Sequence, residues 1–339
     1  MMDLNTTWFL LIGVLLTGYA VLDGFDLGVG VLHLFATDER QRRINLAAIG
    51  PVWDGNEVWL LTAGGAMFAA FPPVYATVFS GFYTAFMLLL FALIFRAVSI
   101  EFRGQVDGPR WRRFWDRTFG LGSLAPAVLF GVAIGNVLRG LPIGADGSLH
   151  VSFFALLNPY SLLIGLLSLA MFVMHGAVYL AARTDGELQK RMARWATGAW
   201  AGFLILYVVA TVATVFVSPF LFEPIPHNLL AWGLCLLLLG AVVSIPVMVR
   251  AGRFVLAFLA SAATIGSMIG LMGVSLYPRM VPSSIDPVNS LNIYDDSSTQ
   301  RTLTVMLVVA LVGMPLVIGY TAYVYKVFMG KIVIPKDGY

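Results

Sequence analysis

Two pairs of acidic residues lie inside apolar stretches of the chain, and the members of each pair are three positions apart. Asp23 and Asp26 form the first pair, and Asp54 and Glu57 form the second. Positions i and i+3 of a helix share one face, so each pair presents two carboxyls in the same direction. Carboxyls that are close together and shielded from water share protons, because like charges disfavour ionisation of both. The spacing therefore favours a proton-conducting chain of carboxyls.

Each acid also has a simpler explanation. Asp54 lies near the start of a predicted helix, where free amides and the helix dipole favour a negative side chain. For Asp23 and Asp26 the alternative is pairing with a buried arginine, and Arg96 is the candidate partner. Glu57 lies close enough to a helix start to reach water, so it is the weakest of the four.

The histidines do not form a metal or haem site in the sequence. Haem binding inside a membrane typically uses a His pair on facing helices, and only His175 is well placed within an apolar span. His33 lies near the end of a span, and His150 and His227 fall in loops. No Cys or His cluster has metal-ligand spacing. We therefore expect His175 to be a hydrogen-bonded packing residue, and the single Cys235 to be packing as well.

The elements that carry these residues must be membrane helices. Hydrophobic residues make up 59% of the 339 residues and charged residues only 12%, about half the ~25% of a globular domain. Apolar stretches of roughly 20 residues recur, which is the length of a membrane helix rather than of a barrel strand. The sequence therefore predicts an all-α, polytopic membrane protein. A charge at the bilayer centre costs about 2.5–3.5 kcal/mol on insertion scales, so the buried carboxyls must face protein, water or a cation.

We expect nine membrane-spanning helices in one integral membrane domain over residues 1–339. The first is too long for a signal-peptide core and is expected to remain a helix. A weak internal repeat groups the helices into two four-helix units, 8–138 and 156–277, plus a peripheral helix at 303–328; the alternative is that all basic loops look alike. The predicted spans are 8–34, 53–71, 75–100, 119–138, 156–182, 196–218, 229–249, 254–277 and 303–328.

The basic residues predict the orientation of these spans. Of the 21 Lys and Arg residues, 18 fall in the C-terminal segment and the loops on its side of the membrane, and only Arg139, Arg279 and Arg301 fall on the other side. The positive-inside rule then places the N-terminus outside and the C-terminus in the cytoplasm. The net charge of +3 is explained by basic residues that set the orientation in the membrane. It gives no reason to expect a nucleic-acid partner. The four carboxyls are then expected to converge in the cytoplasmic half of the membrane.

The acid-bearing stretches resemble the signature segments of subunit II of the cytochrome bd-type quinol oxidases, the cytochrome d ubiquinol oxidase subunit II family. Residues 18–28 read GYAVLDGFDLG, and residues 50–60 read GPVWDGNEVWL. Shorter similar stretches lie at 62–66, 131–136, 157–159, 282–284 and 297–303. The resemblance thus covers essentially the whole chain.

The resemblance implies a multi-pass subunit of a complex that oxidises quinol and reduces oxygen to water in the bacterial cytoplasmic (inner) membrane. In this family subunit I carries two b-type haems, one d-type haem and the quinol site, and forms a heterodimer with a haem-free subunit II. Some members hold a structural quinone in subunit II, and a small single-span subunit is left open. The family assigns the aspartate matched here by Asp54 to a proton path from the cytoplasm, and Asp23 and Asp26 lie in the same region.

The sequence departs from the family pattern in two places, and it is compatible with two other functions. Glu57 stands where Gln also occurs in the family, and the short loop at 219–228 is more like that of the cyanide-insensitive type. The rival function is a stand-alone ion-coupled secondary transporter with buried carboxylates, although helices broken at matching positions in both halves are not evident. A purely structural subunit without a proton role is the other alternative.

Overall fold

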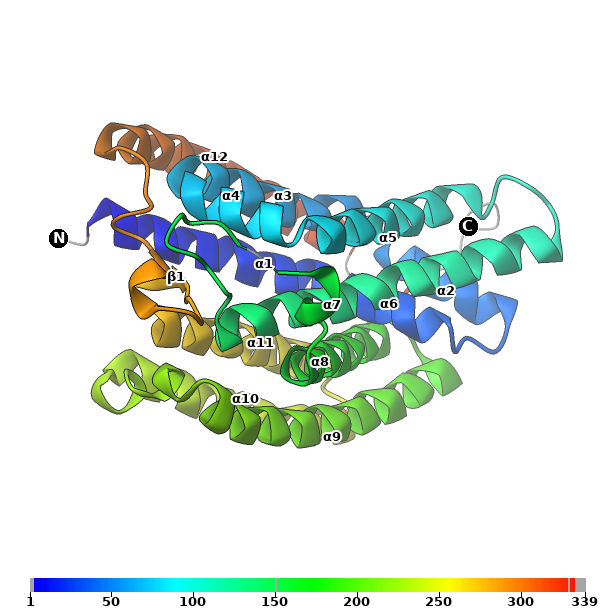
Figure 1. Ribbon diagram of the computed structural model, residues 1–339. Coiled ribbons are helices and arrows are strands. Elements are labelled where there is room, and N and C mark those ends of the chain that lie inside the picture. Colours follow the sequence, from blue (N-terminus) through cyan, green and yellow to red (C-terminus); the bar gives the residue numbers. More distant parts are fainter. Residues whose placement is uncertain (1–2, 150, 329, 333–339) are drawn as a thin grey trace.

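The computed structural model describes residues 3–149, 151–328 and 330–332, and it is a bundle of long helices lying broadly along one direction (Figure 1). Within the described residues, eight helices are long and apolar enough to cross a membrane. The all-α, multi-span architecture predicted from the sequence is therefore confirmed. These helices are α1 (Leu4–His33), α5 (Tyr83–Phe102), α6 (Pro109–Arg139), α8 (Pro159–Arg183), α9 (Gly186–Val217), α10 (Leu229–Arg250), α11 (Phe254–Leu276) and α12 (Gln300–Val327).

Two predicted spans, 53–71 and 75–100, do not correspond to single helices of the apolar set. The first is the helix α3 (Trp53–Ala70), which begins with polar turns and is not among these eight helices. The second was predicted as one helix, which is wrong, because α4 (Pro72–Gly81) and α5 are separated at Phe82. A Cβ atom on Gly81 would overlap the side chain of Leu149, so an extended segment packs against the helix beside this break.

Several short elements were not predicted. An amphipathic helix, α2 (Glu39–Ile49), follows α1, and the Asp38 side chain caps it by accepting a hydrogen bond from the Gln41 amide at 2.8 Å. The connection between the predicted spans 254–277 and 303–328 contains an antiparallel hairpin of two strands. The remaining elements are α7 (Phe153–Leu156), β1 (Arg279–Val281), β2 (Leu291–Asn292) and the 3-10 turns Pro219–Phe222, Ile225–His227 and Pro287–Asn289.

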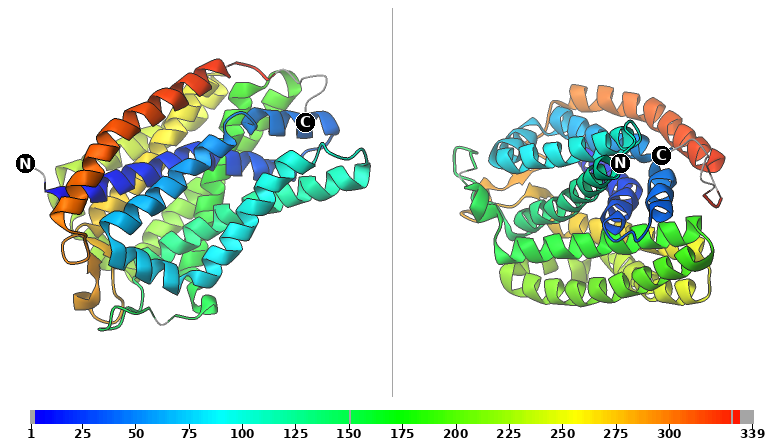
Figure 2. Two further views of the ribbon diagram at one scale, coloured as in Figure 1. Left: turned by 90° about the horizontal axis from the view of Figure 1, so that it is seen from above. Right: turned by 90° about the vertical axis from the view of Figure 1, so that its right-hand side faces the viewer.

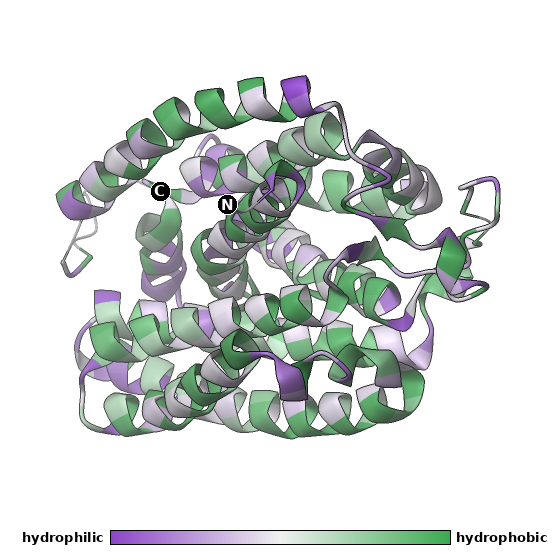
Figure 3. Cartoon of the chain, turned by 90° about the vertical axis from the view of Figure 1, so that its left-hand side faces the viewer, coloured by the Kyte–Doolittle hydropathy of each residue, from purple (hydrophilic) through white to green (hydrophobic). Residues whose placement is uncertain are grey.

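The bundle has two chemically different ends. One end, which we call the basic end, holds α2, the end of α1 and the connections α5–α6, α8–α9 and α10–α11, with most of the arginines. The opposite end holds the start of α1 and the β1–β2 hairpin (Figure 1). Figure 3 colours the helices mainly as hydrophobic, and many large apolar side chains along them are exposed, as expected for helices that face lipid.

The helix α1 lies in the interior, where it contacts α3, α6, α8, α11 and α12. In the end view of Figure 2, α1 lies near the middle, α8 to α11 lie on one side, and α12 follows the outer edge. Only 6% of the most apolar window of α12 is buried, which fits a peripheral helix. The division into two four-helix units stays a prediction, since these contacts describe only pairs of helices.

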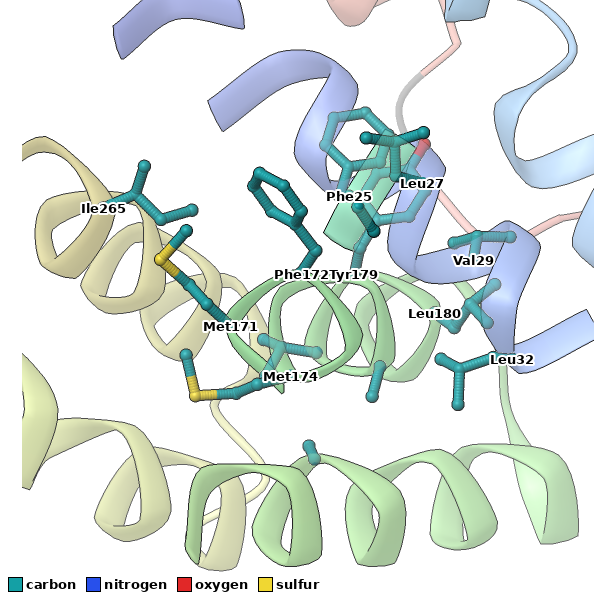
Figure 4. Packing of buried hydrophobic residues seen from close by; sticks show 14 of the residues in the cluster. Phe25, Leu27, Val29, Leu32, Met171, Phe172, Met174, Tyr179, Leu180 and Ile265 are labelled. Atoms are coloured by element: carbon teal, nitrogen blue, oxygen red, sulfur yellow. The ribbon is translucent and has the colours of Figure 1, made fainter. Parts of the chain in front are cut away.

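The helices α1 and α8 cross at close range through two glycines. A Cβ atom on Gly28 would overlap the carbonyl oxygen of Phe172, and one on Gly176 would lie 2.6 Å from the carbonyl carbon of Gly28. Glycine is therefore required at both positions for the backbones to approach so closely. Figure 4 shows the apolar side chains, including Phe25 and Tyr179, that pack around this crossing. The crossing fixes the part of α1 that carries the first acidic pair.

Candidate proton-transfer site

Three of the four predicted acids meet around or beside one buried arginine. Arg96 on α5 is fully buried and binds Asp23 on α1 through two nitrogens, with Nη2–Oδ1 at 2.6 Å and Nη1–Oδ2 at 3.0 Å. The same Nη1 atom donates to Oε1 of Glu57 on α3, also at 3.0 Å. One guanidinium thus joins three helices that are far apart in the sequence.

Close packing of α5 on α6 places Arg96 in this position. A Cβ atom on Gly122 of α6 would lie 2.8 Å from the carbonyl oxygen of Ala92 and 3.0 Å from the Arg96 amide. The absence of a side chain at Gly122 therefore lets the α5 backbone lie against α6. The Arg96 side chain then extends to α1 and α3.

Asp26 is fully buried but binds no cation among the described residues. Its Oδ2 atom accepts a hydrogen bond from Asn56 Nδ2 at 2.7 Å, while its Oδ1 atom has no hydrogen-bond partner in the part of the chain that is described. Asn56 Oδ1 in turn accepts from the hydroxyl of Tyr325 at 3.0 Å. Asn56 and Tyr325 therefore connect Asp26 to the end of α12.

The sequence reasoning did not identify Asn56 or Tyr325. Asn56 was identifiable in principle, because it lies between Asp54 and Glu57 in the same signature stretch. Tyr325 carried no such signal, since it is one of three tyrosines near the end of an apolar helix, 269 positions away from Asn56.

Asp54 lies apart from this cluster. It is the second residue of α3 and is exposed, whereas the N-cap residue is Val52, which makes no side-chain capping bond. The capping hydrogen bond considered for Asp54 is therefore not present, although its place in the first turn still suits the helix dipole. Among the described residues, Asp54 forms no ion pair or hydrogen bond. It lies one helical turn before Glu57, on the side of the basic end.

The charges in the cluster do not balance when every carboxyl is ionised. One guanidinium offsets one negative charge, but Asp23, Glu57 and Asp26 together carry three carboxyls in a mostly buried setting. Uncompensated charge is expensive away from water. The cluster is therefore stabilised when it retains protons.

A second buried ionic cluster lies at the basic end, and the sequence reasoning missed it. Asp116 on α6 lies 2.7 Å from His33 Nε2 and accepts from Arg103 Nε at 2.6 Å, and Arg103 also binds Glu39 of α2 at 2.9 Å. Burial alone lowers the pKa of Arg103, but the hydrogen bonds and charges of Asp116 and Glu39 raise it above its ordinary value. Arg103 therefore remains charged and fixes α2 to the ends of α1, α5 and α6.

His175 does not fit haem ligation. Its Nδ1 atom lies 2.6 Å from Ser261 Oγ, its Nε2 atom donates to the Val21 carbonyl at 3.0 Å, and its ring stacks on Phe258 with centroids 4.5 Å apart. Both ring nitrogens are therefore occupied in a fully buried site. No group of three or more His, Cys, Asp or Glu side chains in the described residues could hold a metal ion.

Taken together, the helices and the buried cluster define a polytopic membrane protein with ionisable groups at its centre. The chain belongs to the cytochrome bd terminal oxidase subunit II family, whose sequence model matches residues 4–328. Members of this family are subunits of an oxidoreductase complex, and the family gives no support to the alternative of an ion-coupled transporter.

Relatives match the chain over nearly its full length. It is 38% identical to cytochrome bd-I ubiquinol oxidase subunit 2 of Escherichia coli K12, with 97% of this chain and 95% of the relative covered. It is 36% identical to cytochrome bd ubiquinol oxidase subunit 2 of Bacillus subtilis, with 98% of each covered. The structure of bd oxidase from Geobacillus thermodenitrificans shares the fold, with a TM-score of 0.81, 18% identity and 97% and 99% of the two chains covered.

Proposed function

We propose that this chain carries protons from the cytoplasm toward a haem-bearing subunit I, in which quinol is oxidised and oxygen is reduced to water. Two observations support the proposal: the relatives are named as ubiquinol oxidase subunits, and buried carboxyls outnumber the cations that face them. The cluster around Arg96 is the observation that carries it, because reduction of oxygen to water consumes protons as well as electrons.

The proposed route begins at Asp54 and continues through the buried cluster. Asp54 is exposed at the basic end, and Glu57 lies one turn further along the same face of α3. Glu57 and Asp23 are joined through Arg96, and Asp26, about one helical turn nearer the basic end than Asp23, offers an oxygen that has no partner among the described residues. Each carboxyl takes a proton from the preceding group and releases it to the next.

We further propose that subunit I covers the exposed face of α3 and α5. Glu57 remains 24% exposed, and its neighbours Val58 and Leu61 are 46% and 74% exposed. A carboxyl that faces lipid is costly, so a protein partner on this face is favoured. The b-type and d-type haems and the quinol site are assigned to that partner, since the described histidines do not fit haem. A structural quinone and a small single-span subunit are allowed by the family, but the proposal assigns them no residues.

Purification through an affinity tag on this chain tests the function. We expect a coloured heterodimer whose optical spectrum contains b-type and d-type haem bands, together with quinol oxidase activity. A colourless chain that purifies alone from membranes in which both genes are expressed would contradict the proposal.

The orientation is tested separately by fusing reporters to the chain. The basic end is proposed to face the cytoplasm, because basic residues are retained on that side of the membrane. A reporter after Tyr339 should therefore behave as cytoplasmic, and a reporter inserted in the β1–β2 hairpin should behave as periplasmic. The opposite pattern would reverse the direction of the proposed proton path.

Replacement of His175 tests the assignment of the haems to the partner. The His175→Ala variant is expected to keep nearly all the haem of the purified complex, because both ring nitrogens already bind protein groups. Some stability is lost with the stacking on Phe258. Haem content per complex is measured by the pyridine haemochrome spectrum, and loss of one haem from an assembled complex would contradict the assignment.

A further inference from the structure

A groove of about 360 Å³ lies on α9 near the basic end, away from the carboxyl cluster. It is lined by Arg191, Arg194, Trp195, Gly198 and Ala199. The early turns of α9 that contain the two arginines were not part of the predicted span, because they are amphipathic rather than apolar. The groove therefore lies where α9 passes from its charged turns into its apolar stretch, which is the level of the lipid headgroups.

The two arginines of the groove have no acidic partner among the described residues. Arg191 donates to three neutral oxygens, which are Thr37 Oγ1 at 2.9 Å, Gln41 Oε1 at 2.8 Å and the Phe35 carbonyl at 2.7 Å. Arg194 is exposed and forms no hydrogen bond in the described part of the chain. These contacts hold Arg191 in place but leave the positive charge of the groove without an ion pair.

The acidic residue of α9 that is closest in sequence to the two arginines binds a lysine outside the groove. Glu187, in the first turn of α9, binds Lys190 Nζ at 2.8 Å. Its charge therefore acts mainly on Lys190 and only more weakly on Arg194, without an ion pair to either groove arginine. An anion from outside the chain can bind the exposed guanidinium of Arg194 there, beside the positive charge of Arg191.

The apolar side of the groove is open because two glycines lie on one helix face. A Cβ atom on Gly198 or on Gly202 would meet nothing within 4 Å, and residues four positions apart lie one above the other. Trp195 lies beside the two arginines, and its ring centroid is 5.1 Å from the ring centroid of Phe35. The result is a shallow, open groove that starts at the two arginines, beyond which the apolar face of α9 continues past Gly202.

We propose that this groove binds an anionic phospholipid, with its phosphodiester at Arg191 and Arg194 and one acyl chain along Gly198 and Gly202. A free phosphate would use only the arginines, whereas the open glycine face continues into the membrane-spanning part of α9 and suits a hydrocarbon chain. The site is independent of the proton path, so its failure would leave the proposed function intact.

Native mass spectrometry of the purified complex tests the headgroup contact. Phosphatidylglycerol and phosphatidylcholine are supplied in equal amounts in detergent, and we expect the complex to retain phosphatidylglycerol preferentially. Arg194→Gln should lower that retention about fivefold, the effect of about 1 kcal/mol per basic residue near an anionic lipid. Arg250→Gln, which removes an exposed arginine outside the groove at the same end, is the control and should have no effect. Equal retention of both lipids, or no effect of Arg194→Gln, would overturn the proposal.

A second variant separates a lipid from a free anion. Gly198→Leu fills the groove but keeps both arginines. The leucine side chain can be accommodated because a Cβ atom at this position meets nothing within 4 Å. We expect this variant to lose phosphatidylglycerol while thermal unfolding of the complex stays normal. Inorganic phosphate alone, at millimolar concentration, should not raise the unfolding temperature. If phosphate stabilises the wild type and Gly198→Leu retains the lipid, the groove is an anion site and the lipid assignment is wrong.

Discussion

Replacement of Arg96 by glutamine is expected to prevent stable assembly of the protein. Arg96 is fully buried and is the cation that binds both Asp23 and Glu57. Removal of one partner from a buried ion pair costs about 3–5 kcal/mol, because the remaining charge is left uncompensated. That is a large part of the ~5–15 kcal/mol that stabilises a typical folded protein. The amount of tagged chain in membranes and the unfolding temperature of the purified complex measure this effect.

The matched control for this variant is Arg112→Gln. Arg112 binds Asp107 at 2.8 Å in a solvent-exposed pair, and exposed pairs contribute about 0–1 kcal/mol. The double variant Arg96→Gln with Asp23→Asn should recover part of the lost stability, since it removes one of the stranded charges. Normal assembly of Arg96→Gln alone would show that the carboxyls are already neutral, and that Arg96 does not hold them together.

Replacement of Asp54 by asparagine is expected to lower quinol oxidase turnover by an order of magnitude or more while assembly is retained. Asparagine keeps the size and polarity of the side chain but cannot take up and release a proton. Because Asp54 is exposed and makes no capping bond, little stability depends on its carboxylate. Steady-state oxygen consumption with quinol, normalised to haem, gives the turnover, and the haem spectrum reports assembly.

Two further variants make the Asp54 experiment decisive. Asp54→Glu should keep partial activity, because the carboxyl remains but is displaced by one methylene. Asp107→Asn removes another exposed carboxylate of the basic end, outside the proposed route, and should leave turnover normal. Wild-type turnover of an assembled Asp54→Asn complex would remove Asp54 from the route and leave uptake to Glu57.

The membrane spans and the acidic pairs could be predicted from the sequence because both depend on local patterns. Apolar length predicts a span directly, and a carboxyl inside a span is conspicuous because it is costly. The pairing of Asp23 with Arg96 was among the alternatives, since few cations lie near the spans. The additional link of Glu57 to the same guanidinium required knowledge of which faces of α1, α3 and α5 meet.

There are physical reasons why some elements were not predicted from the sequence. Hydropathy detects only the apolar part of a helix, so the amphipathic α2 and the charged first turns of α9 were not predicted. The break at Phe82 lies beside a contact between Gly81 and Leu149, which are far apart in the sequence. The bond between Tyr325 and Asn56 is equally non-local. Such contacts follow from the way the helices pack, and local patterns in a single sequence do not predict them.

The glycine crossing of α1 and α8 has a consequence for biosynthesis. Ribosomes deliver α1 to the membrane first, and α8 follows only after α2 to α7 have been synthesised. The surface of α1 around Gly28 therefore lacks its α8 partner until nearly half of the chain has been synthesised, while the nearby carboxyls of Asp23 and Asp26 are already in the bilayer or at its edge. We expect α1 to stay with the insertion machinery until α8 arrives. Release of a nascent chain that ends before α8 should yield a degradation-prone fragment rather than a folded half.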